Sequence, residues 1–371
     1  MNILLVTMSM DIGGAETHIL ELAKELKRRK HVVYVMSNGG KYVEELENYG
    51  IEHIWAPLHN KKISNMKKSY KIIKQVIEDK KIELVHSHTR ISSFVCGILH
   101  KKIKFPFVTS AHWTFKVNTI LRQMTDWGEY VVAVSEDIKE YLIDNYGVDS
   151  SNIIVTVNGI DTEKFSKDID YADISKEFKL NDLANRIVYV SRMDESRALV
   201  ARHLIDIAES LNEKISNLEI VIVGGGDCFD ELSQKCNQIN EKIGKNLLIM
   251  TGARTDINKF ISSGDIFIGV SRAALEAMSA EKPVIVAGNE GYLGIFEKSK
   301  LDKGIETNFC CRGLKMSNQE KLEKDILQLM SCENKEEYGQ YNREVVQKYY
   351  SVKKMTDDCE KAYEEVLKRY K

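Results

Sequence analysis

The sequence predicts an α/β protein with two doubly wound parallel sheets, each covered by helices on both faces. Short apolar runs rich in Val and Ile alternate with amphipathic helical stretches along the whole chain. This alternation pauses once, at the polar residues 168–185, and then resumes. A length of 371 residues is also more typical of two domains than of one.

Six strands are expected before the pause and five after it. The strands of the first half are residues 3–6, 31–36, 82–85, 107–110, 130–134 and 153–157, and those of the second are 187–190, 218–223, 247–251, 266–269 and 283–286. Between the first two strands, Ile19, Leu22, Ala23 and Leu26 line one face of a helix. Three late helices are expected at 319–330, 336–349 and 356–370. Because parallel sheets bind ligands beyond their carboxyl ends, two facing sheets would form one deep cleft.

The composition is that of a globular protein without nucleic-acid partners. Hydrophobic residues make up 43% and charged residues 29%, and the formal net charge of −2 gives no general attraction to nucleic acid. The seven cysteines form no Cys-x-x-Cys pair, which favours reduced thiols in a cytoplasmic protein. We see no signal peptide pattern and no apolar stretch long enough to span a bilayer.

Two glycine-rich turns are candidate sites for an anionic ligand. Gly13-Gly14-Ala15-Glu16 lies between the first strand and the first helix, where backbone N–H groups can approach a phosphate or simply form a tight turn. Gly224-Gly225-Gly226 follows the strand at 218–223 and suits a phosphate or a nucleoside. Neither turn is a Gly-x-Gly-x-x-Gly fingerprint, which argues against a dehydrogenase.

Charged residues follow other strands of the second half. Arg192 and Arg197 are spaced to bind a diphosphate with bidentate bonds, although spacing alone favours surface pairs with Asp194 and Glu195. Glu276 lies one turn into a short helix, where its carboxylate can accept hydrogen bonds from a ribose diol or simply face solvent.

Three histidines follow strands of the first half. His112 is the first candidate for a ligand contact, and His86 and His88 rank well behind it because a single histidine is more often structural. His86-Ser87-His88 suggests a metal site, but no carboxylate or third histidine has a convincing spacing, so we expect no metal.

Residues 61–77 form a basic amphipathic helix. Its lysines are interleaved with an apolar stripe that includes Ile63, Met66 and Ile73. Such a helix can lie on an anionic membrane, but it more often packs on its own sheet with a solvated outer face.

Taken together, these segments resemble glycosyltransferase family 4, the retaining GT-B group, over nearly the whole chain. The motifs that carry the resemblance are Gly13-Gly14-Ala15-Glu16, Thr109-Ser110-Ala111-His112, Asn158-Gly159-Ile160-Asp161, Ser191-Arg192, Gly224-Gly225-Gly226, Gly252-Ala253-Arg254-Thr255-Asp256, Leu275-Glu276-Ala277-Met278 and Pro283-Val284-Ile285. The resemblance implies two facing Rossmann-like domains: an acceptor-side domain at 1–167, completed by a C-terminal helix at 355–371 that crosses back to it, and a donor domain at 168–354.

The resemblance also implies site roles. Arg192, Arg197 and His112 would be catalytic, with His112 near the transferred sugar. Gly14 would lie near the donor phosphates, and Glu276 would bind the ribose. The further candidates for donor contacts are Gly13, Gly224, Gly225, Arg254, Arg272 and Glu290, of which Arg272 and Glu290 are chosen by their proximity in sequence. One departure matters, because the family's first glutamate, which contacts the donor sugar, would fall at Ile268 inside a strand. Arg272 and Glu290 are the candidates to replace that contact.

The expected activity is therefore that of a retaining, hexosyltransferase-type enzyme that needs neither metal nor cofactor. It would move a sugar from a nucleoside-diphosphate sugar, first of all a UDP-sugar, to a glycan or lipid-linked acceptor in cell-envelope or capsule polysaccharide synthesis. It would be cytoplasmic, with a possible peripheral membrane contact through residues 61–77. Two alternatives stay open: a catalytically weakened homologue that binds a glycan or a partner protein, and a sugar-nucleotide epimerase.

Overall fold

The computed structural model describes residues 1–115, 117, 122 and 125–371. Contacts within the chain divide it into unit 1, which comprises Met1–Gly159 and Ser351–Lys371, and unit 2, which comprises Ile160–Tyr350. The division comes earlier than the expected boundary at 167/168 because the intervening residues pack on unit 2. The Ile160 N–H donates to the Tyr350 carbonyl at 2.7 Å, and Ser279 Oγ donates to the Phe165 carbonyl at 2.7 Å.

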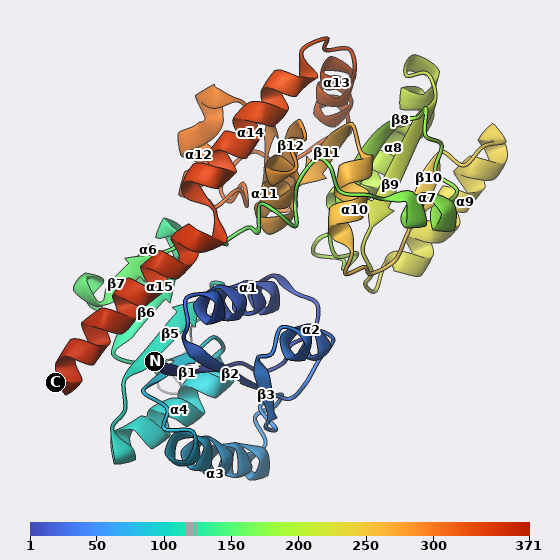
Figure 1. Ribbon diagram of the computed structural model, residues 1–371. Coiled ribbons are helices and arrows are strands. Elements are labelled where there is room, and N and C mark those ends of the chain that lie inside the picture. Colours follow the sequence, from blue (N-terminus) through green and yellow to red (C-terminus); the bar gives the residue numbers. More distant parts are fainter. Residues whose placement is uncertain (116, 118–121, 123–124) are drawn as a thin grey trace. The chain divides into compact units, whose positions relative to one another are not determined.

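Unit 1 holds a seven-stranded parallel sheet in the order β3-β2-β1-β4-β5-β6-β7 (Figure 1). Its strands are β1 (Asn2–Val6), β2 (Val32–Ser37), β3 (Glu52–Trp55), β4 (Leu84–Ser87), β5 (Phe107–Ala111), β6 (Tyr130–Ala133) and β7 (Ile153–Val155). Its helices include α1 (Gly14–Arg28), α2 (Val43–Asn48), α3 (Ile63–Asp79), α4 (Arg90–Ile103), α6 (Glu136–Tyr146) and α15 (Val352–Leu367). Strand β1 shows why both faces are covered: Ile3 and Leu5 pack with α1 and α15, while Leu4 and Val6 face the cluster under α3 and α4.

Helix α15 returns the chain to unit 1 after unit 2 is complete, as predicted for the C-terminal helix. Met355, Cys359, Ala362 and Val366 recur at helical spacing and are fully buried in the core beside α1. At the edge of this contact, Arg29 forms ion pairs with Asp357 at 2.7 Å and with Glu360 at 2.5 Å. The last helix is therefore part of the first core rather than a tail.

Unit 2 holds a six-stranded sheet in the order β10-β9-β8-β11-β12-β13, which is parallel except for β13. Its strands are β8 (Asn185–Val190), β9 (Leu218–Val223), β10 (Leu248–Met250), β11 (Ile266–Gly269), β12 (Val284–Gly288) and β13 (Gly291–Ile295). Its helices are α7 (Ala172–Phe178), α8 (Leu199–Lys214), α9 (Phe229–Ile243), α10 (Ile257–Ser263), α11 (Ser271–Ser279), α12 (Leu301–Glu306), α13 (Gln319–Met330) and α14 (Lys335–Tyr349). Residues of α8, α9 and α13 share one core with alternate residues of the sheet.

Two edge strands were not predicted. Strand β3 reads Glu-His-Ile-Trp, and none of its residues is fully buried, so it lacks the continuous apolar run of the central strands. Strand β13 contains Gly291 and Gly294, which are depleted in strands, and it pairs antiparallel to β12 with a bulge at Val286 and Ala287. The alternation of strands and helices predicted from the sequence therefore includes neither strand.

Candidate functional site

In unit 2, two loops meet at the carboxyl ends of neighbouring strands. Arg192 lies in the loop after β8, and Gly224, Gly225 and Gly226 follow β9. The Met193 N–H donates to the Gly225 carbonyl at 3.0 Å, and the Met193 carbonyl accepts from the Cys228 N–H at 2.8 Å. The arginine-bearing loop and the glycine loop are thus held together as one surface at the sheet edge.

The glycines are required for this close approach. A Cβ atom on Gly224 would lie 1.7 Å from the Ser191 carbonyl oxygen, and one on Gly226 would lie 2.6 Å from the Met193 carbonyl carbon. Both residues also have positive φ values, of +145° and +155°, that L side chains rarely adopt. The N–H groups of Gly225 and Gly226 donate to no described residue, so they remain available to an anion.

Both predicted phosphate-binding arginines are exposed on this surface. The competing interpretation is that these arginines form surface pairs with Asp194 and Glu195; of these two carboxylates, Glu195 pairs with Arg202 at 2.8 Å. Glu290 lies near Arg197: burial raises the pKa of the Glu290 carboxyl, and the Arg197 charge lowers it in part. Arg312, which the sequence did not point to, lies 3.5 Å from Glu290.

Glu276 is 5% exposed and lies in α11, with its Oε1 2.9 Å from the Arg272 Nε one turn earlier. The solvent-facing alternative for Glu276 is therefore wrong. Helix α11 begins at Ser271, which has a φ of +51°, next to the segment in which Asn308, Phe309 and Cys311 also have positive φ values. Such strained residues persist where the surrounding structure imposes them, and they cluster at functional sites.

Arg254 is placed differently from the other predicted donor contacts. Its guanidinium makes two hydrogen bonds to Asp256, at 2.9 and 2.8 Å, and two to Glu177, at 2.8 and 3.1 Å. It also lies 5.5 Å from the ring centroids of Phe178 and Phe260. This arrangement favours a structural role that ties α7 to the loop after β10.

In unit 1, the predicted glycine turn begins helix α1. Gly13 is the N-cap residue in an extended conformation, and its carbonyl accepts from the Thr17 N–H at 2.9 Å and from Thr17 Oγ1 at 2.8 Å. A Cβ atom on Gly14 would have no neighbour within 4 Å. The turn therefore leaves open space at the N-terminus of α1, where the helix dipole favours negative charge.

His112 follows β5 and lies among three other histidines. His88 Nδ1 is 3.2 Å from His112 Nε2, and the ring centroids of His18 and His112 are 4.7 Å apart. The expectation that no third histidine accompanies this group is wrong, because α1 brings His18 to it. Burial lowers the pKa of His112 to about 4 and that of His86 to about 3, so both imidazoles are neutral near pH 7.

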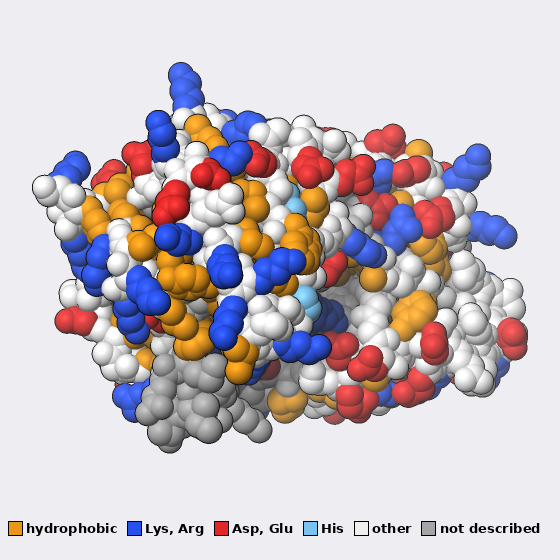
Figure 2. Space-filling model, turned by 90° about the horizontal axis from the view of Figure 1, so that it is seen from below, with side chains coloured by type: hydrophobic (Ala, Val, Ile, Leu, Met, Phe, Trp, Pro, Cys, Tyr) orange, Lys and Arg blue, Asp and Glu red, His pale blue; other side chains and the backbone are white. Residues whose placement is uncertain are grey.

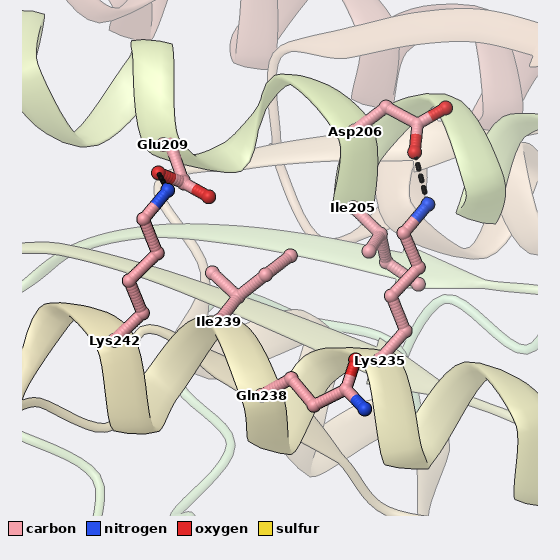
Figure 3. A pocket seen from close by; sticks show the side chains of 7 residues that line it. All are labelled: Ile205, Asp206, Glu209, Lys235, Gln238, Ile239 and Lys242. Atoms are coloured by element: carbon pink, nitrogen blue, oxygen red, sulfur yellow. Dashed lines mark hydrogen bonds and ion pairs between the residues drawn. The ribbon is translucent and has the colours of Figure 1, made fainter.

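A separate pocket of about 320 Å³ lies between α8 and α9 (Figure 3). Its lining residues are Ile205, Asp206, Glu209, Lys235, Gln238, Ile239 and Lys242. Lys242 Nζ lies 2.5 Å from Glu209 Oε2, and Lys235 pairs with Asp206 in the same way. None of the predicted site residues lines this pocket, and its paired charges leave little net attraction for an anionic ligand.

Comparison with known proteins decides the family. The family model described as Glycosyltransferase Family 4 matches residues 12–164, and the one described as Glycosyl transferases group 1 matches residues 184–331. The chain belongs to the family 4, group 1 glycosyltransferases. As a glycosyltransferase, it has two parallel-sheet α/β domains of the GT-B type.

Two relatives have sequences that align with more than half of this glycosyltransferase. It is 23% identical to an uncharacterized glycosyltransferase of Methanocaldococcus jannaschii, with 96% of each chain covered. It is 27% identical to a UDP-Gal:alpha-D-GlcNAc-diphosphoundecaprenol alpha-1,3-galactosyltransferase of Escherichia coli, over 60% of this chain and 61% of the relative.

Solved structures show the same fold. A glycosyltransferase of Rickettsia africae superimposes with a TM-score of 0.77 at 22% identity, covering 99% of this chain and 98% of that one. An Anabaena protein, HepE, solved in complex with UDP, superimposes with a TM-score of 0.74 at 17% identity, covering 98% and 100%. Within the described residues, no helix of the glycosyltransferase combines the length and the apolar character needed to cross a membrane.

Proposed function

We propose that this glycosyltransferase is a retaining enzyme that uses a nucleoside-diphosphate sugar, in the first instance a UDP-sugar. Its acceptor is a glycan or lipid-linked sugar of cell-envelope or capsule polysaccharide synthesis, reached from the cytoplasm. The observation that carries this proposal is the joined surface after β8 and β9: the loop that bears exposed Arg192 and Arg197 is hydrogen-bonded to a glycine loop whose Gly225 and Gly226 N–H groups have no partner among the described residues. Support also comes from the Escherichia coli relative, whose name specifies UDP-Gal and a diphosphoundecaprenol-linked acceptor, and from the Anabaena structure with UDP-glucose.

The proposed chemistry of unit 2 is charge stabilisation on the leaving group. Breaking the bond from the sugar to the diphosphate places negative charge on the departing diphosphate. Arg192 and Arg197, together with the N–H groups of Gly225 and Gly226, stabilise that charge without a proton transfer. Glu276, held by Arg272, accepts hydrogen bonds from the ribose diol.

Glu290 is the better candidate to replace the family's first glutamate. The side chain of Arg272 is 11% exposed and is engaged by Glu276. The side chain of Glu290 is 37% exposed and lies beside Arg197, so a donor held by Arg197 has this carboxylate close to it. In this proposal, Glu290 accepts hydrogen bonds from sugar hydroxyls, and Arg312 orients it.

The acceptor side of the proposal includes a membrane contact through α3. Ile63 at the start of α3 is 67% exposed, and Trp55 in β3 is 50% exposed, with Lys68 Nζ 4.9 Å from the Trp55 ring centroid. Lysines and arginines are interspersed with hydrophobic side chains on the face that carries α3 and α4 (Figure 2). Cationic and apolar side chains side by side suit an anionic lipid surface.

The deciding experiment incubates the full chain with a panel of nucleoside-diphosphate sugars, with and without a lipid-linked acceptor, and measures nucleoside diphosphate release. Acceptor-dependent release with one donor supports the proposal. Conversion of the donor without an acceptor would replace it with the epimerase.

A weakened, glycan-binding homologue is the second candidate, because fully buried Ile268 of β11 occupies the position of the family's first glutamate. That candidate predicts no release with any donor, together with retained glycan binding.

A further inference from the structure

Four histidines of unit 1 lie together at the carboxyl edge of its sheet, and the proposed function uses only His112. The ring centroids of His86 and His88 are 4.1 Å apart, and those of His88 and His112 are 5.5 Å apart. His18 and His86 have no exposed surface, and His88 is 3% exposed. The group combines residues from α1, from β4 and its end, and from the end of β5.

Three of these rings present nitrogen atoms to one another. One nitrogen from each of His18, His88 and His112 lies within 4.8 Å of the other two. A tetrahedral zinc ion, with Zn–N distances of about 2.0–2.1 Å, holds its ligand nitrogens about 3.3 Å apart. The 3.2 Å between His88 Nδ1 and His112 Nε2 already matches that spacing.

His86 supports this arrangement without being a ligand. Its Nδ1 is hydrogen-bonded to the Tyr363 hydroxyl at 2.7 Å, and its Nε2 to Ser110 Oγ at 2.8 Å. Because both ring nitrogens are used, His86 is fixed and packs against the ring of His88. Neighbours that orient ligands in this way are a regular part of metal sites.

Protein contacts do not fully satisfy His88. Its Nε2 is buried and has no hydrogen-bond partner among the residues that the structure describes. Among the described residues, the ring of His88 is therefore hydrogen-bonded only to His112, and its Nδ1 is the nitrogen placed to ligate an ion beside His112 Nε2.

We propose that His18, His88 and His112 bind one divalent transition metal ion, with Zn²⁺ as the preferred ion. Imidazole nitrogens suit zinc, and three histidines with a fourth, open position form a site that accepts an outside oxygen ligand. Zinc bound here engages His112 and therefore inhibits sugar transfer. That consequence rests on the proposed function, whereas the binding itself does not.

The test uses the full chain with any affinity tag removed and with metal stripped by a chelator. Zn²⁺ binding is measured by titration calorimetry, and Co²⁺ binding by the visible absorption of the tetrahedral ion. We expect the wild-type chain to bind a single ion, and His18→Asn, His88→Asn and His112→Asn each to weaken binding by about tenfold or more. His203→Asn, at a partly buried histidine of unit 2, is the matched control and keeps wild-type affinity.

Circular dichroism and the metal-free Tm show which variants fold. His112→Asn changes the most exposed of the three ligands, so it serves if a buried variant does not fold. The proposal is overturned if the wild-type chain binds no better than the triple variant, or if His112→Asn keeps wild-type affinity. Zinc binding by a chain that releases no nucleoside diphosphate would remove the proposed function and leave the metal site standing.

Discussion

The carboxyl edges of the two sheets are built alike and carry opposite chemistry. In unit 1 the edge presents buried imidazoles that are neutral near pH 7, and α15 helps to hold them through Tyr363 and His86. In unit 2 the edge presents exposed arginines and unused N–H groups, held by backbone contacts between two loops. The same topology thus provides a permanently positive surface in one unit and a cluster of neutral, titratable imidazoles in the other.

The structures of the two edges depend on different parts of the chain. The unit 2 surface depends on glycine backbone, because a Cβ atom at Gly224 or Gly226 would overlap neighbouring backbone atoms. The unit 1 surface depends on side-chain packing from a helix far along the sequence. Variants at the two edges should therefore fail in different ways.

The largest expected effect is on catalysis at the unit 2 edge. Arg192→Ala should lower kcat about 100- to 1000-fold, because removing one preorganised donor to a developing negative charge has an effect of that size. The variant should keep its Tm, since Arg192 is exposed. Steady-state nucleoside diphosphate release checks the rate, and Arg28→Ala, at an exposed arginine that pairs with Glu25 in α1, is the control. Wild-type turnover in Arg192→Ala would refute the assigned role.

The next effect compares the two glycine turns. Gly224→Ala should destabilise the protein by about 3 kcal/mol, because its Cβ would lie 1.7 Å from the Ser191 carbonyl oxygen and its φ is +145°. Gly14→Ala should be neutral or stabilise by up to about 1 kcal/mol, because it meets open space at a helix start. Urea unfolding measures both, and equal effects would contradict the contrast between the two edges.

A third effect is the acid sensitivity of the unit 1 edge. The pKa of His112 is lowered to about 4 in the folded chain, so the unfolded state binds more protons below the ordinary value of about 6.5. Stability should therefore fall as the pH drops from about 6.5 toward 4. His112→Asn should reduce the stability lost between pH 7 and pH 5 by about 1–2 kcal/mol, as measured by urea midpoints. An unchanged pH dependence would show that His112 is not a buried neutral base.

The smallest effect concerns the hydroxyl that joins α15 to β4. Tyr363→Phe removes the 2.7 Å bond to His86 Nδ1 in a fully buried place and should destabilise by about 1 kcal/mol. Tyr370→Phe, near the surface, loses a 2.9 Å bond to the Phe105 carbonyl and should have less effect. Differential scanning calorimetry compares the two variants. A larger destabilisation in Tyr370→Phe than in Tyr363→Phe would argue against a stabilising hydrogen bond between Tyr363 and His86.

Strands that are buried along their whole length, and helices with one regular apolar stripe, were predictable from sequence. The strand at 218–223 was predicted at its observed bounds because all six residues are buried and apolar or paired, and the helix at 319–330 because its apolar stripe follows one period. The edge strands β3 and β13 were missed because half-exposed or glycine-rich strands carry no such signal.

Site residues that belong to a local sequence motif could be predicted. Site residues that come together only through tertiary packing could not. Arg192 and Gly224 follow strands directly, so their place at the sheet edge could be inferred from order alone. His18 could not be linked to His112, because their proximity depends on how α1 packs on the sheet. The motif around Arg254 predicts a donor contact, whereas the structure pairs Arg254 with Glu177. These two residues are far apart in sequence, so no local pattern could predict their ion pair.

Unit 1 combines Met1–Gly159 with Ser351–Lys371, whereas unit 2 is one unbroken stretch between these two segments. During synthesis, the ribosome therefore releases everything that unit 2 needs before it releases Ser351–Lys371. Until those last residues emerge, the apolar side of α1 and the adjoining strands lacks the cover that Met355, Ala362 and Val366 provide. A nascent chain must keep that surface from aggregating for the whole time that the second unit is being made.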